Sequence, residues 1–311
     1  MSKKRMVIAL GHKDLGRNLP EQKVAVAKTA VMIANFIEDG YQIAIVFSNA
    51  PQVSMIHTAM KDLAAHYSQY TRTPLSVCSA MSQGMIGYDL QNAIRAELLK
   101  RGICKTVSTV LTQVMVDPYD DSFYNPVKAV GKVMNKEEAE QEEEDGNTVA
   151  ETGEGSYQRI VPAPKPKAIV EIEAIKALLD ADQVVIAAGG GGIPVMQQGS
   201  NLRGAAAVIE KDLAAGLLAK ETDADILLIT TAVDHVSLNY GKPDEKRLDT
   251  VTTEEAKQYI ADGHFEFRSM QPKVETGIDF VATGNGRKAV ITTMECAEKA
   301  IAGLAGTTIK S

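Results

Sequence analysis

Val184–Val195 reads VVIAAGGGGIPV: five apolar residues followed by four glycines. The apolar run predicts a buried strand, and the glycines predict the loop that leaves it. Glycine can turn its N–H groups toward an anion, and it has no Cβ to keep that anion from the backbone. We therefore predict a phosphate-binding loop, with a flexible strand-to-helix turn as the alternative. Neither the ending of a P-loop nor the spacing of the dinucleotide fingerprint is present.

Strands and helices alternate on both sides of this loop. Apolar runs predict further strands over 5–10, 41–47, 106–111, 226–230 and 288–292. Helical spacing predicts helices over 21–38, 89–101, 169–180, 210–220, 253–261 and 273–280. Strands separated by helices of this length indicate an α/β fold, with a largely parallel sheet covered on both faces.

The segment from Asp117 to about Ser156 interrupts this alternation. It contains two prolines and an acidic run over 137–145, and it has little apolar periodicity. A structureless insert of this length is unusual inside a compact domain, so we predict a small protruding subdomain or lid. The acidic run is typical of a solvated helix or loop.

Composition narrows the class of protein. The chain has 311 residues, 45% of them hydrophobic, and a formal net charge of -7. This is enough apolar material for a sizeable core, and the acidic balance argues against nucleic acid or anionic membranes as partners. The apolar runs are too short to span a membrane, which favours a cytoplasmic protein. The three cysteines and five histidines lack metal-ligand spacing, so no protein-held metal is predicted.

Two lysines lie at predicted helix starts. Lys211 lies between two acids in Glu210-Lys211-Asp212, and Lys273 follows Pro272. A lysine is unfavourable at the positive end of a helix unless an anion binds there. The two could meet over one phosphoryl group, although solvated surface charges are the alternative and spacing alone does not bring them together.

Several motifs, in this order, make the chain resemble the carbamate kinases of the amino acid kinase superfamily over essentially its whole length. They lie at 74–78, 81–88, 125–128, 161–164, 188–195, 208–213 and 269–273. The resemblance implies an open αβα sandwich with a mainly parallel central sheet, formed by a single domain over 1–311. It implies an N-terminal substrate half (about 1–165) with a protruding subdomain (about 117–160), a C-terminal nucleotide half (about 166–311) and a homodimer.

The implied activity is reversible phosphoryl transfer between ATP and carbamate, giving carbamoyl phosphate and ADP, in arginine metabolism. Mg²⁺ would accompany the ATP or ADP. The implied catalytic residues are Lys128, Lys211, Asp212 and Lys273. The implied substrate-binding residues are Gly11, His12, Lys13, Ser48, Asn49 and Ala50. The implied phosphate- and nucleotide-binding residues are Gly189, Gly190, Gly191, Gly192, Tyr240 and Met270. Such chemistry needs positioning and charge neutralisation, and no general base, because carbamate is already anionic.

The chain departs from the family pattern in its loops. The family's Gly-Gly-Asn is replaced by Gly11-His12-Lys13. The family's Thr-His-Gly-Asn-Gly-Pro-Gln-Val-Gly corresponds to residues 46–54. Its Gly-Ser-Met-Gly-Pro-Lys corresponds to residues 268–273, in which Arg268 replaces the first glycine. If the replaced glycines required positive φ, the substituted residues would strain the loops and weaken carbamate turnover. The residues concerned are His12, Ser48, Ala50 and Ser54.

Three readings follow from these departures. The protein could be a kinase for a different small carboxylate or with weakened activity. It could be a catalytically impaired nucleotide-binding protein that acts as a regulator or complex subunit. If the replaced positions need no positive φ, catalysis is ordinary.

Overall fold

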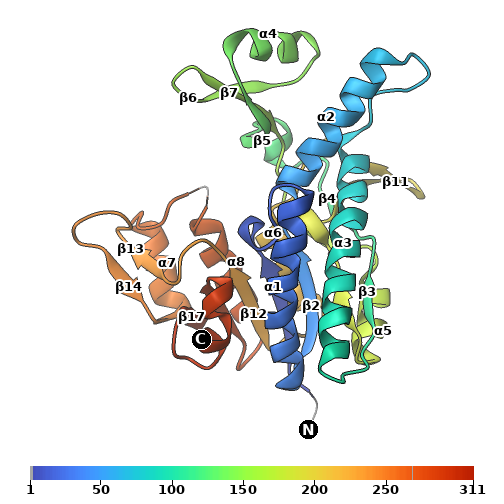
Figure 1. The fold of residues 1–311 in the computed structure, drawn as a ribbon. Coiled ribbons are helices and arrows are strands. Elements are labelled where there is room, and N and C mark those ends of the chain that lie inside the picture. Colours follow the sequence, from blue (N-terminus) through green and yellow to red (C-terminus); the bar gives the residue numbers. More distant parts are fainter. Residues whose placement is uncertain (1–2, 268) are drawn as a thin grey trace.

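The computed structural model describes residues 3–267 and 269–311, so the substituted Arg268 lies outside the described residues. An eight-stranded sheet forms its centre (Figure 1). The strands, in spatial order, are β15 (Thr250–Thr252), β17 (Thr307–Lys310), β16 (Lys288–Thr292), β12 (Ile226–Thr230), β1 (Arg5–Leu10), β2 (Gln42–Phe47), β9 (Val184–Ile186) and β3 (Val107–Thr109). Neighbouring strands are parallel except for β16 and β17, which are antiparallel.

Side chains alternate between the two faces of this sheet and enter two hydrophobic cores. In β1, Val7 and Ala9 face one core, while Met6, Ile8 and Leu10 face the other. The first core is covered by α5 (Ile172–Asp180), α6 (Lys211–Glu221), α7 (Thr253–Ala261) and α8 (Gln271–Val281). The second is covered by α1 (Leu19–Glu38), α3 (Leu75–Lys100) and α9 (Ala297–Ile301). The predicted α/β sandwich with a mainly parallel sheet is confirmed.

Smaller elements flank this sandwich. A second sheet contains β11 (Asn201–Gly204), β10 (Ile193–Gln198), β4 (Gln113–Val116) and β8 (Pro166–Ile169), and a hairpin contains β13 (Val236–Leu238) and β14 (Lys246–Leu248). Short 3-10 helices are η1 (His12–Asp14), η2 (Asp121–Phe123), η3 (Gly189–Gly191) and η4 (Met294–Cys296). None of the helices in the described ranges is long and apolar enough to cross a membrane.

A small unit stands above the sandwich, beside the long helix α2 (Ala50–His66) (Figure 1). It consists of β5 (Lys128–Met134), α4 (Lys136–Glu144), β6 (Val149–Gly153) and β7 (Ser156–Val161). The acidic run forms α4, which Asn135 and Glu138 cap reciprocally. Lys61 of α2 pairs with Glu142 of α4 and, at 3.0 Å, with Asp145 just beyond it, so charge fastens the unit to α2.

The structure differs from the prediction in several elements. Helix α3 begins at Leu75 rather than at 89, α2 was not predicted, and residues 166–169 form a strand before α5. The strands β15 and β17 at one edge of the central sheet were not predicted either, nor were the smaller flanking strands. The first half of α3 is rich in serine and glycine, which are weak helix formers, so its helicity depends on packing. Gly87 shows this dependence, because a Cβ there would lie 2.4 Å from Cγ2 of Thr109 on β3.

Two glycine substitutions on α3 test this packing. Gly84→Ala should raise Tm slightly, because Gly84 is exposed, a Cβ there would meet no atom within 4 Å, and alanine favours helix by about 1 kcal/mol. Gly87→Ala should lower the free energy of unfolding by about 1–3 kcal/mol, the usual cost of overpacking. Thermal and urea unfolding measure both. Equal stabilisation by the two variants would show that α3 and β3 are not in close contact.

Candidate active site

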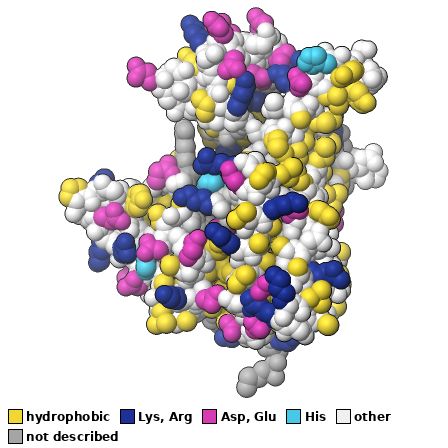
Figure 2. All heavy atoms as spheres, in the orientation of Figure 1, with side chains coloured by type: hydrophobic (Ala, Val, Ile, Leu, Met, Phe, Trp, Pro, Cys, Tyr) yellow, Lys and Arg dark blue, Asp and Glu magenta, His cyan; other side chains and the backbone are white. Residues whose placement is uncertain are grey.

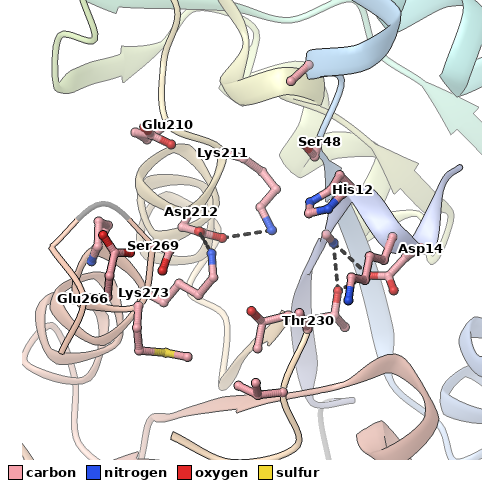
Figure 3. Close-up of a pocket in the computed structure, with 18 of the residues that line it drawn as sticks. His12, Asp14, Ser48, Glu210, Lys211, Asp212, Thr230, Glu266, Ser269 and Lys273 are labelled. Carbon is pink, nitrogen blue, oxygen red and sulfur yellow. Dashed lines mark hydrogen bonds and ion pairs between the residues drawn. The ribbon is translucent and has the colours of Figure 1, made fainter. Parts of the chain in front are cut away.

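Asp212 lies between two lysine ammonium groups at the centre of a cleft (Figure 3). Its Oδ1 is 2.9 Å from Nζ of Lys211, and its Oδ2 accepts a hydrogen bond of 2.6 Å from Nζ of Lys273. Lys211 is the first residue of α6 and Lys273 lies in the first turn of α8. The start of α8 thus brings Lys273 to Asp212, which lies 61 residues earlier in the sequence. The two lysines therefore converge on one carboxylate, which the sequence had left open.

Burial makes this cluster electrostatically strong. The exposed fractions of the Lys211, Asp212 and Lys273 side chains are only 11%, 7% and 16%. Burial alone would raise the pKa of Asp212, but the two ammonium groups outweigh it and hold that pKa at about 2. Burial lowers the pKa of Lys211, with Asp212 opposing it. Two cations share one carboxylate, so the cluster favours a further anion.

Three helix N-termini open onto the same region. Residues in the first turns of α2, α6 and α8 all line the cleft, and the N-caps Asn49, Glu210 and Met270 make no side-chain cap hydrogen bond. Uncapped N–H groups and the helix dipole favour negative charge at such ends. Lysines at two of these three ends strengthen this preference. The arrangement can bind and neutralise phosphoryl oxygens.

The glycine run forms a tight turn after β9. Gly190, Gly191 and Gly192 have φ of +68°, +89° and +92°, which L side chains rarely adopt. A Cβ on Gly191 would lie 2.2 Å from the carbonyl oxygen of Ile209, just before α6. A Cβ on Gly190 would collide with the side chain of Asn49 at the start of α2. Glycine is thus required for close approach of the α2 and α6 starts.

A buried carboxylate organises the loop after β1. Asp14 Oδ2 accepts hydrogen bonds from the Gly11 N–H, at 2.8 Å, and from the Thr230 hydroxyl. Burial raises the pKa of Asp14, and these hydrogen bonds oppose the rise. Nζ of Lys211 donates to the carbonyl oxygen of Ala9 at 3.1 Å, so the end of strand β1, just before this loop, positions Lys211. Sequence reasoning missed Asp14 and Thr230, which belong to no motif.

The expected strain in the substituted loops is wrong. His12, Ser48, Ala50 and Ser54 are absent from the residues with positive φ. His12 begins the short helix η1, while Ala50 and Ser54 lie in the regular helix α2. Ser48 precedes α2 and also lacks positive φ. Backbone outside the positive-φ region accepts L side chains, so the side chains at these four positions cause no backbone strain of the expected kind.

Two adjoining cavities meet at Lys211. The larger, about 850 Å³, includes His12, Lys13, Tyr240 and Met270 in its lining, as well as Lys273. The smaller, about 420 Å³, includes Asn49, Gly190 and Gly192. The residues shared by both cavities are Ser48, Ala50, Ser54, Lys128, Ala129, Val130, Gly131, Glu210 and Lys211.

The predicted site residues thus gather at one cleft, in two groups. Gly11, His12, Lys13, Tyr240 and Met270 line the larger cavity. Gly190 and Gly192 line the smaller cavity instead, so they are in a different cavity from Tyr240 and Met270. Gly189 and Gly191 are buried and line neither cavity. Nζ of Lys128, from β5, lies 2.5 Å from a carboxylate oxygen of Glu210, so this ion pair crosses from the protruding unit to the start of α6.

Comparison with known proteins shows which family has this sequence. Residues 4–293 match the amino acid kinase family. The chain belongs to the amino acid kinase family. It is 47% identical over 306 residues to a carbamate kinase-like protein of Escherichia coli, with 98% of this chain and 99% of that protein covered. It is 45% identical over 311 residues to a carbamate kinase of Clostridium perfringens, with 98% and 99% covered.

A solved structure agrees with the sequence relatives. The carbamate kinase of Giardia lamblia bound to AMP-PNP superposes with a TM-score of 0.92 at 35% identity, and 99% of each chain is covered. The suspected resemblance to carbamate kinases is therefore confirmed at the level of both sequence and fold.

Replacing Asp212 tests the charge cluster. Asp212→Asn leaves two buried ammonium groups without their carboxylate, so it should lower the free energy of unfolding by about 3–5 kcal/mol near neutral pH. Asp62→Asn, at a side chain 74% exposed, is the matched control and should change stability by about 0.5 kcal/mol or less. Urea unfolding measures both variants.

The pH dependence of this difference has a definite sign. The Asp212 pKa falls from 3.8 to about 2 on folding, so its contribution is complete above pH 4 and is lost as the pH falls toward 2. The stability gap between the wild type and Asp212→Asn should narrow over that window. A gap that is constant with pH would contradict an ionised Asp212 held by two lysines.

Proposed function

We propose that this protein catalyses reversible phosphoryl transfer between ATP and carbamate, giving carbamoyl phosphate and ADP. The observation that carries the proposal is the Lys211–Asp212–Lys273 cluster, situated where a larger and a smaller cavity meet. Phosphoryl transfer needs two bound reactants in line, with positive charge beside the moving group. The carbamate kinase relatives support this reaction over others of the family.

In this proposal the larger cavity holds the nucleotide. Tyr240, Met270 and Phe265 supply apolar surface for the base, and Lys211 and Lys273 lie beside the phosphates. The starts of α6 and α8 add N–H groups directed toward the same anionic groups. The Lys211 ammonium, held by Asp212 and the Ala9 carbonyl, needs little reorganisation when charge develops.

The smaller cavity would hold carbamate. One carbamate oxygen attacks the γ-phosphorus while the bond from that phosphorus to the bridging oxygen breaks, and ADP leaves with that oxygen. No proton moves in this step, so no general base is needed. Lys128 and Lys211 line both cavities, so their positive charges are close to the phosphoryl group both before and after its transfer from ATP to carbamate.

The carboxylates present fit a magnesium ion that arrives with the nucleotide. Both oxygens of Asp212 face lysines and Glu210 pairs with Lys128, so these carboxylates are partly neutralised. Within the described ranges, no group of three or more His, Cys, Asp or Glu residues could hold a metal ion by itself. Phosphate oxygens and water would supply most of the ligands of the Mg²⁺ ion, and the carboxylates of Glu210 and Asp212 could supply the others. The ion would neutralise part of the phosphate charge.

The backbone at His12, Ser48, Ala50 and Ser54 has no positive φ, which supports an active enzyme over an impaired nucleotide-binding protein.

We also propose that the protein forms the homodimer that the resemblance implies. Light scattering tests this by measuring the molecular mass in solution.

Single lysine replacements test the catalytic assignment. Lys211→Ala and Lys273→Ala should each lower kcat by on the order of 10², the usual loss for one preorganised electrostatic partner. ADP affinity should fall less, because the lysines act most strongly on the transition state. ATP formation from ADP and carbamoyl phosphate, followed by phosphorus NMR, measures the rate, and calorimetry measures ADP binding.

Lys220→Ala is the matched control, because Lys220 is an exposed lysine at the other end of α6. It should retain wild-type turnover. Wild-type rates in Lys211→Ala and Lys273→Ala would refute their catalytic roles, and a wild-type protein that forms no ATP from carbamoyl phosphate would refute the proposed reaction.

A further inference from the structure

The smaller cavity has a basic group at a distance from the lysine cluster. Arg159, on β7, is half-buried, and its Nη1 lies 3.4 Å from Nε2 of His57 on α2. Both residues line the cavity, to which β5 and β7 of the protruding unit contribute. Figure 2 shows Lys and Arg side chains, with some Asp and Glu side chains among them, around the hollow below that unit. Neither residue takes part in the phosphoryl transfer described above.

The carboxylates around Arg159 are already engaged. Glu142 pairs with Lys61 and also accepts a hydrogen bond of 2.6 Å from the Asn147 amide. Asp145 pairs with Lys61 at 3.0 Å and with Arg72 at 2.8 Å. Within the described part of the chain, no carboxylate lies within ion-pair distance of the Arg159 guanidinium. Burial lowers the pKa of Arg159, and the charge of Glu142, which forms no direct ion pair with it, opposes that effect. A ligand anion in direct contact with the guanidinium would offset the remaining cost of burial.

The cavity is also larger and more basic than carbamate alone requires. Carbamate has four heavy atoms, whereas the cavity measures about 420 Å³ and one water in the liquid occupies about 30 Å³. Five lysine and arginine side chains line it against three carboxylates. Val53, Leu75 and Val208 form apolar wall between the charged ends.

Helix α2 sets the separation of these ends. Its first residue, Ala50, lies at the phosphoryl-transfer end, and His57 lies seven residues further along. At 1.5 Å per residue, this separation is about 10 Å. A ligand that reaches both ends needs two anionic groups joined by an apolar spacer.

We propose that Arg159 and His57 form a distal anion subsite, so that the cavity accepts, besides carbamate, a small dicarboxylate whose second carboxylate binds there. This proposal rests on the assignment of the smaller cavity to the acceptor. Arginine suits this role because its planar guanidinium binds a carboxylate through two parallel hydrogen bonds. The His57 ring limits where the guanidinium can point and leaves its other N–H groups for the ligand.

Adipate and hexanoate are matched probes, because they share a six-carbon skeleton and differ in the second carboxylate. At equal concentration and ionic strength, adipate should raise Tm of the wild-type protein more than hexanoate does. Arg159→Gln should weaken adipate binding, measured by calorimetry, by on the order of tenfold or more, as expected for losing a charged hydrogen-bonding partner. Hexanoate binding should change little.

Arg72→Gln is the matched control. Arg72 is another arginine near the protruding unit, where it pairs with Asp145. Its side chain is 61% exposed and does not line the smaller cavity. This variant should retain the adipate preference. Arg159→Lys keeps the charge without the paired donors, so it should bind adipate with intermediate affinity, and it serves if Arg159→Gln does not fold.

Two results would overturn the subsite: equal stabilisation of the wild type by adipate and hexanoate, or unchanged adipate affinity in Arg159→Gln and Arg159→Lys. Carbamoyl phosphate turnover by the same wild-type preparation separates the two proposals. Turnover without an adipate preference refutes the subsite alone. An Arg159-dependent adipate preference without turnover refutes the carbamate reaction alone.

Discussion

The buried ion cluster of Lys211, Asp212 and Lys273 is the interaction on which the rest of the site depends. Two ammonium groups can stay charged in a largely buried place only because one carboxylate lies between them. That carboxylate leaves one positive charge in excess, which a phosphoryl group can use. Lys211 begins α6 and Lys273 lies in the first turn of α8, so the cluster also holds the two helices together. The same contacts therefore contribute to stability and place the positive charge.

Strand order explains why these groups meet. The loops after β1, β2, β9 and β12 leave the same edge of a parallel sheet, and they carry Gly11, Ser48, the glycine run and Thr231. In open α/β sheets ligands bind beyond the carboxyl ends of the strands, where helix starts add their dipoles. The close approach of Gly190 to Asn49 and of Gly191 to Ile209 then fixes how near the starts of α2 and α6 can come.

The protruding unit joins this edge through ion pairs and through a small hydrophobic cluster, in which Val161 of β7 packs with Val53 of α2 and Leu75 of α3. Lys128 pairs with Glu210, and Lys61 pairs with Glu142 and Asp145 across to α2. Its strands β5 and β7 supply Lys128 and Arg159 to the lining of the smaller cavity. The smaller cavity therefore has walls from two parts of the chain, the protruding unit and the starts of α2 and α6.

The sequence by itself determined the alternation of strands and helices, the parallel sheet, the glycine turn and the two lysines at helix starts, because each depends on local periodicity or on a short motif. It could not determine that α3 begins at Leu75, since packing of Gly87 against Thr109 outweighs weak helix formers. Nor could the sequence show that His12, Ser48, Ala50 and Ser54 adopt backbone angles without positive φ, so the predicted strain in these loops was wrong. Only the tertiary structure decided that Asp14 meets Thr230 and that Arg159 faces His57, because those contacts join residues 216 and 102 positions apart, and no local pattern records them.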